Sequence, residues 1–116
     1  PSRWREAASP TPTAAAPAAL AAPLPANETA ARVRNLAPAH CTVVGAYHTA
    51  RVTNITANEQ GYLITTDYTR ANYGSVDTGF AITECVGRIL HINTTNLHGT
   101  AVVVTATGDH MTTALF

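Results

Sequence analysis

Cys41 and Cys85 are the only two cysteines of the chain, and most of its strand-forming sequence lies between them. A single pair in a chain of otherwise extracellular character indicates one disulfide bond. Closing the loop from residue 41 to residue 85 stabilises a folded domain by roughly 4 kcal/mol in the loop-entropy description. No further cysteine pair is spaced to complete a zinc site. We therefore expect one domain that is crosslinked by a disulfide bond.

The low content of charged residues limits the functions that the chain can have. Charged residues make up 12% of the chain and the net charge is zero, whereas soluble domains average about 25%. This excludes the basic surface that nucleic acid or anionic lipid requires. No apolar run approaches the roughly 18 residues of a membrane span, and Ala101–Val104 has the length of a strand, so we expect no membrane span. The chain begins at Pro1 without a methionine, and we expect a processed or truncated amino terminus in a secreted or surface-exposed protein.

Residues 1–26 form a low-complexity segment in which prolines alternate with alanine, serine and threonine. Each proline removes a backbone donor and biases the preceding residue toward extended geometry, which predicts an extended arm. Because the arm has few large side chains, we expect it to pack on a neighbouring subunit, in a homo-oligomer or against other proteins. Trp4, the only tryptophan, is the expected anchor for that interaction. Packing of Trp4 on its own domain is the alternative.

Residues 27–39 are read as a short helix or a linker. Asn27 is a favourable N-cap, and the apolar residues that follow have helical spacing up to Leu36. Pro38 is expected to follow the end of this helix.

Residues 40–116 are read as an all-β domain. Apolar and polar residues alternate, and turn residues recur between the alternating runs. The pattern predicts a small antiparallel β-sandwich or barrel of about seven short strands, at residues 40–48, 49–55, 62–68, 80–85, 88–92, 100–107 and 111–116.

Three Asn-x-Thr sequons begin at Asn27, Asn54 and Asn93. They lie at the ends of expected elements, where a glycan is readily accommodated. We expect at least one of them to be glycosylated.

No cluster of catalytic or metal-binding residues emerges from the spacing of the titratable residues. The five histidines show neither the i, i+2 spacing of a strand nor the i, i+4 spacing of a helix, and no serine lies in a Gly-x-Ser-x-Gly turn. The seven acidic residues form no obvious catalytic pair. We expect neither a metal nor a cofactor, and no catalytic residues.

One segment resembles a known family. Thr107-Gly108-Asp109-His110-Met111-Thr112-Thr113 is similar to the carboxy-terminal strand of the small microbial guanyl-specific ribonucleases, and Gly79-Phe80 and Arg88-Ile89-Leu90 look like landmarks of the same family. The resemblance implies RNA cleavage through a 2′,3′-cyclic phosphate, with His110 as general acid and Arg88 as a phosphate ligand. Glu84 is the nearest candidate for the base. A related scaffold without catalysis is the other implication.

Three functional hypotheses follow from the sequence. The leading one is a non-enzymatic structural or assembly subunit, of the extracellular filament or virus coat type, whose N-terminal arm packs on a neighbouring subunit. The second is the ribonuclease-like protein. The third is a carbohydrate-binding or receptor-binding module, with a stacking surface supplied by Tyr47, Tyr62, Tyr68 and Tyr73; packing of these tyrosines between strands is the alternative.

Overall fold

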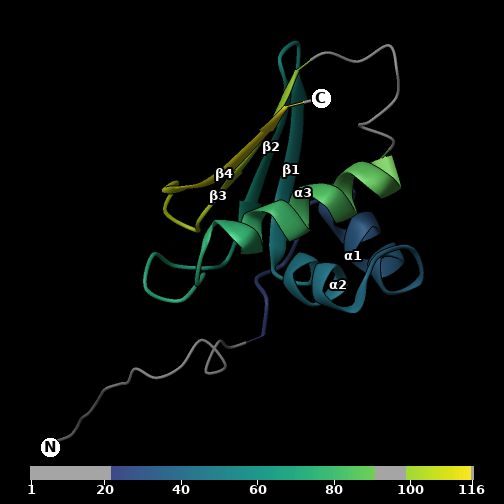
Figure 1. Cartoon of the computed structure of the whole chain (residues 1–116). Coiled ribbons are helices and arrows are strands. Elements are labelled where there is room, and N and C mark those ends of the chain that lie inside the picture. The colour runs from purple at the N-terminus through teal and green to yellow at the C-terminus, as the bar shows by residue number, and fades with distance from the viewer. Residues whose placement is uncertain (1–21, 91–98, 116) are drawn as a thin grey trace, which may run out of the picture.

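The computed structural model describes residues 22–90 and 99–115, which form an α+β fold. The elements, in chain order, are α1 (Glu28–His40), α2 (Val43–Thr49), β1 (Val52–Asn58), β2 (Gly61–Thr66), α3 (Val76–Leu90), β3 (Thr100–Val104) and β4 (His110–Leu115). The four strands form one mixed sheet (Figure 1). The prediction of an all-β sandwich or barrel with seven strands is therefore wrong.

The sheet consists of two hairpins joined side by side in the order β1-β2-β3-β4. β1 pairs with β2, and β3 with β4, in antiparallel fashion, whereas β2 and β3 are parallel. Parallel neighbours need a long crossover connection, and α3 is the helix of that crossover. The parallel pairing begins at Gly61 and Thr100, where Gly61 has a φ of 141° and any side chain would collide with the carbonyl oxygen of Thr100.

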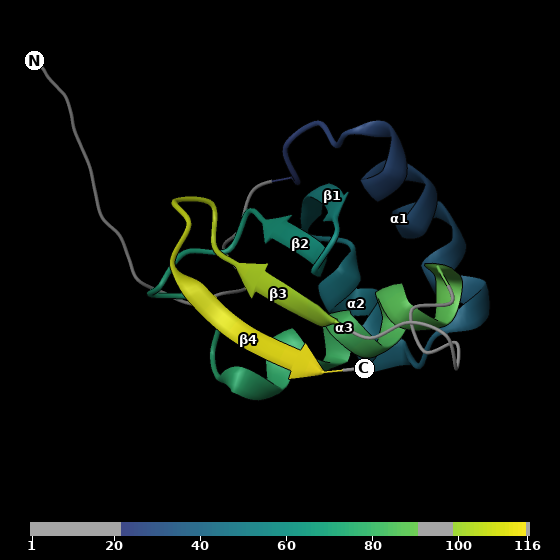
Figure 2. The same cartoon turned by 90° about the horizontal axis from the view of Figure 1, so that it is seen from above.

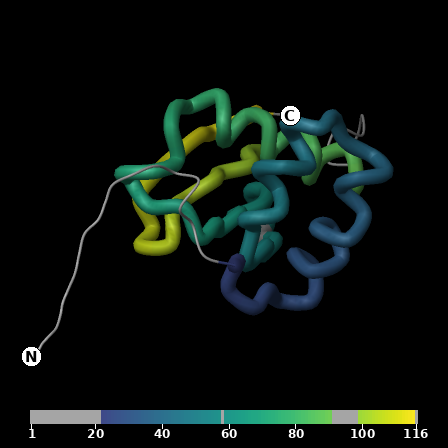
Figure 3. The backbone as a smooth tube through the Cα atoms, turned by 90° about the horizontal axis from the view of Figure 1, so that it is seen from below, coloured from purple at the N-terminus to yellow at the C-terminus, as the bar shows by residue number. Residues whose placement is uncertain are grey.

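Helices cover one face of this sheet. α1 packs over β1 and α3 packs over β3 and β4, while α2 packs mainly on α3 and α1 (Figures 1 and 2). The backbone trace places α1 at one side of the molecule and the β3–β4 hairpin at the other (Figure 3). The core lies between the two layers, and its most buried side chains are Val33, Val52, Ile64, Ile82, Val86 and Val103.

Two of the expected strands and part of a third are helices. Residues 40–48 fall largely in α2, and the predicted strands at 80–85 and 88–92 fall in α3, apart from residues outside the described ranges. α2 begins at the N-cap Thr42, whose Oγ1 accepts a hydrogen bond of 3.0 Å from the Gly45 amide. In α3 the buried Ile82 and Val86 are four residues apart, which is helical spacing. The β-branched residues of α3 cost a few tenths of a kcal/mol each in helix propensity, and burial of this apolar face outweighs that cost.

α1 also extends further than expected. It continues through Pro38 and ends at His40. Because Pro38 lies in the last turn, the missing proline N–H affects only the end of the helix, and the Cys41 amide still donates to the Ala37 carbonyl at 2.9 Å.

Asn27 joins the start of α1 to the outer edge of β1. Its Oδ1 accepts a hydrogen bond of 2.9 Å from the Ala30 amide, as an N-cap does, and one of 3.3 Å from the Ile55 amide. Its Nδ2 donates to the Ile55 carbonyl at 3.0 Å, and its backbone amide donates to the Thr53 carbonyl, also at 3.0 Å. One residue therefore caps the helix and occupies backbone groups at the edge of the sheet.

Replacing Asn27 separates these two functions. Asn27→Ala removes the cap and the side-chain bonds to Ile55, and we expect it to lower the free energy of unfolding by about 1–3 kcal/mol. Asn27→Ser keeps a capping oxygen but is too short to reach β1, so its loss should be intermediate. Urea denaturation followed by circular dichroism measures both. An Asn27→Ala variant as stable as the wild type would contradict this role.

Gly79 permits the closest approach of α3 to β4. A methyl group at this position would collide with the side chain of Thr112. The same threonine donates a hydrogen bond of 2.9 Å from its Oγ1 to the Val76 carbonyl, in the first turn of α3. The helix and the strand are thus held in direct contact where α3 begins.

Gly79→Ala should destabilise the domain, although alanine is the better helix former. Overpacking costs about 1–3 kcal/mol and exceeds the gain of about 1 kcal/mol in propensity. Gly45→Ala is the matched control, because the nearest atom to an added methyl group there is Thr42 Oγ1 at 3.2 Å. Thermal denaturation should show a lower midpoint for Gly79→Ala than for the control. The reverse order would refute the close contact.

Candidate functional site

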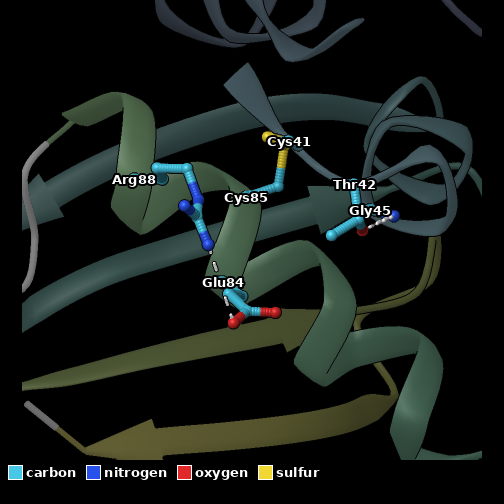
Figure 4. The surroundings of a disulfide bond; sticks show 6 residues. All are labelled: Cys41, Thr42, Gly45, Glu84, Cys85 and Arg88. Atoms are coloured by element: carbon cyan, nitrogen blue, oxygen red, sulfur yellow. Dashed lines mark hydrogen bonds and ion pairs between the residues drawn. A yellow bond between two sulfur atoms is a disulfide. The ribbon is translucent and has the colours of Figure 1, made fainter. Parts of the chain in front are cut away.

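The expected disulfide between Cys41 and Cys85 is present. The Cα atoms are 5.3 Å apart. Cys41 lies between α1 and α2, and Cys85 is buried in the middle of α3 (Figure 4). The bond thus joins the corner between two helices to a third helix, and not two strands as the sequence had suggested. It fixes the start of α2 against α3.

A groove of about 560 Å³ lies beside this bond. One wall is the start of α2, the second is the outer face of α3, and the third is the end of β4. The lining residues are Thr42, Val44, Asp77, Phe80, Ala81, Thr83, Glu84, Ala101, Ala114 and Leu115. Because Thr42 follows Cys41 directly and Glu84 precedes Cys85, the disulfide sets the separation of two of the walls.

The groove exposes large apolar side chains. Val44 is 60% exposed, Phe80 46% and Leu115 82%. Val43, beside the groove on α2, is 88% exposed. Each exposed apolar residue alone is ordinary, but a contiguous group around a hollow is typical of an interaction surface.

Two carboxylates accompany these apolar residues. Asp77 and Glu84 both line the groove from α3. Glu84 Oε2 lies 3.9 Å from Arg88 Nη2, and both side chains are more than half exposed (Figure 4). A solvent-exposed pair of this length contributes little to stability, so Glu84 can exchange its partner at small cost. The groove therefore combines exposed apolar side chains on its three walls with two acidic groups on the α3 wall.

The groove also adjoins an open edge of the sheet. Within the described residues, β4 has a neighbouring strand on one side only. At the opposite edge of the sheet, Asn27 occupies backbone groups of β1. The two edges thus differ in their capacity to accept another strand.

The sequons and the arm anchor are only partly described. Asn27 bonds β1 and caps α1 as set out above. Asn54 lies in β1, half-exposed, opposite Thr65 of β2. Trp4 and Asn93 lie outside the described residues. Glycosylation at the three sites stays a prediction.

The residues that the ribonuclease resemblance implies lie apart. His110 starts β4, two residues before Thr112, which bonds the first turn of α3. Arg88 is twelve residues further along α3 than Val76, a rise of about 18 Å along the helix axis. His110 Nε2 instead pairs with Thr113 Oγ1 at 2.6 Å, and Arg88 with Glu84. The resemblance does not correspond to an assembled site.

The described residues contain neither a membrane-spanning helix nor a cluster of metal ligands. No helix among them is long and apolar enough to cross a membrane, and no group of three His, Cys, Asp or Glu residues is placed to hold a metal ion. No protein-family model matches the chain, and neither the curated proteins nor the solved structures contain a significant match to it.

The disulfide is open to a direct test. We expect the double variant Cys41→Ser/Cys85→Ser to lose about 4 kcal/mol of unfolding free energy, since the unfolded chain regains the entropy of an open loop. Guanidinium denaturation of the oxidised wild type and of the variant measures the difference. Reduced wild-type protein should unfold like the variant. A loss below about 1 kcal/mol would show that the bond does not hold α2 against α3.

Proposed function

We propose that the chain is a secreted, non-enzymatic assembly subunit, and that the groove between α2, α3 and β4 binds the N-terminal arm of another copy. The observation that carries the proposal is a groove in which exposed apolar side chains and two carboxylates lie beside β4, the strand that, within the described residues, has a neighbour on one side only. The disulfide is compatible with an extracellular setting, because such bonds persist in oxidising compartments.

The strand edge supports binding of an extended segment. A free edge presents unpaired N–H and C=O groups, and an extended peptide that adds to it gains main-chain hydrogen bonds. Alternate side chains of such a peptide point toward the helix layer, where the groove lies. Asn27 already engages β1 at the opposite edge, so β4 is the favoured position for addition.

The arm has the chemistry that this groove accepts. Its first residues include Arg3-Trp4-Arg5, an aromatic side chain between two cations. The indole matches the apolar surface of Val44, Phe80 and Leu115. The two guanidinium groups match the carboxylates of Asp77 and Glu84.

The length of the arm allows exchange between copies. The 21 residues before Ala22 span up to roughly 70 Å when extended at about 3.3 Å per residue. A segment of this reach can bridge to a neighbouring subunit. Repeated exchange of arms would link copies into a closed oligomer or a filament.

Removal of residues 1–20 is the first test of the proposal. We expect the truncated chain to be monomeric in sedimentation velocity at concentrations where the full chain assembles. The truncation leaves Asn27 and its bonds intact, so the circular dichroism spectrum should match that of the wild type and show that the domain stays folded. Trp4→Ala should weaken assembly at least tenfold, and Thr11→Ala in the same arm is its control.

A charge exchange distinguishes this groove from any other site. Asp77→Arg/Glu84→Arg should abolish assembly, and adding Arg3→Glu/Arg5→Glu to the same chain should restore it. Full-length wild-type chain that remains monomeric, or truncated chain that still assembles, would refute the proposal.

A further inference from the structure

A second hollow, of about 410 Å³, lies between α2, the loop from β2 to α3 and the segment before α1. It shares no lining residue with the groove. Three tyrosines and one histidine line it: Tyr47, His48, Tyr68 and Tyr73. This volume lies within the range of about 300–1,000 Å³ that small-molecule sites occupy.

His48 and Tyr68 form the polar centre of this hollow. His48 Nδ1 lies 2.7 Å from the Tyr68 hydroxyl oxygen. Burial lowers the pKa of His48 from 6.5, and burial is also the main cause that raises the pKa of Tyr68 to about 12. Both groups are therefore neutral at pH 7.

The neutral pair can form with either imidazole tautomer. The phenol O–H donates to Nδ1 when the imidazole proton is on Nε2, and Nδ1–H donates to the phenol oxygen when the proton is on Nδ1. Among the described residues, no hydrogen bond occupies Nε2, which donates in the first tautomer and accepts in the second. The Tyr68 oxygen retains lone pairs that can accept a hydrogen bond.

The charged residue in the lining is neutralised by a partner. Arg51 Nε lies 2.8 Å from Asp67 Oδ1, and the two side chains are only 15% and 7% exposed. The other lining residues are uncharged. A charged ligand would therefore lose its hydration without gaining an opposite charge, so the hollow favours a neutral ligand.

The aromatic rings provide faces for stacking. Tyr47 is 65% exposed and meets the His48 ring edge-on, with ring centroids 5.1 Å apart. Tyr73 lies in the loop between β2 and α3 and is half-buried. Its backbone carbonyl oxygen accepts a hydrogen bond of 2.7 Å from Thr78 Oγ1. The exposed face of Tyr47, beside neutral groups that donate and accept hydrogen bonds, suits a ring that carries hydroxyl groups.

We propose that this tyrosine-histidine hollow binds a neutral saccharide ring. The C–H face of the sugar packs on the exposed Tyr47 ring, and its hydroxyls form hydrogen bonds with His48 Nε2 and with the Tyr68 hydroxyl. The site is independent of the arm-binding groove.

The probes for the test are maltose, cellobiose, lactose and chitobiose, each titrated to millimolar concentration into full-length ¹⁵N-labelled protein. We expect at least one to shift amide resonances around residues 47–51 and 72–78. Tyr47→Ala and His48→Phe should each weaken that binding at least tenfold. Phe80→Ala, which truncates an exposed aromatic in the groove, should leave it unchanged and serves as the matched control.

Folding of each variant is checked by circular dichroism, and Tyr68→Phe gives a milder second variant that removes only one hydroxyl. Tighter binding of glucuronic acid than of the neutral sugars, or of indole than of any sugar, would overturn the saccharide assignment. So would the absence of binding by all four disaccharides. Loss of sugar binding in Phe80→Ala would overturn the location.

Discussion

The covalent link from Cys41 to Cys85 holds the helical layer together. α2 has only seven residues, too few to persist alone, and it packs mainly on α3 and α1 and hardly on the sheet. The disulfide and the burial of Cys85 position this short helix against α3. Both hollows have a wall from α2, at its start in the groove and at its end in the tyrosine-histidine hollow. The bond therefore supports each proposed site without taking part in its chemistry.

α3 connects the structural and functional parts of the molecule. Its inner face contributes Ile82 and Val86 to the core, and Gly79 lets its first turn touch β4. Its outer face presents Asp77, Phe80 and Glu84 to the groove. Apolar burial on one face fixes the helix, and the opposite face is left for recognition. Asn27 engages the β1 edge of the sheet, whereas β4 has a neighbouring strand on one side only within the described residues. An added strand is therefore expected at β4.

The sequence predicted the elements with a strong local signal. The disulfide and the strand segments around Ile64 and Val103 agree with the structure. α2 and α3 were missed because Thr, Val and Ile favour strands locally, and only tertiary burial makes these helices stable. Thr42 as an N-cap was the available signal for α2.

The groove was not predictable, since Val44, Phe80 and Leu115 meet only in three dimensions. The tyrosines were grouped as a stacking surface, yet Tyr62 packs against the core instead of lining the hollow.

Trp4 of one copy is proposed to occupy the groove of another. Trp4 is the only tryptophan, so fluorescence of the unlabelled full-length chain reports on this residue alone. A dilution series in which the emission maximum and the sedimentation coefficient are followed together is the most direct measurement. We expect blue-shifted emission in the assembled protein and a red shift that follows dissociation. Emission typical of water-exposed tryptophan in the assembled state would contradict it.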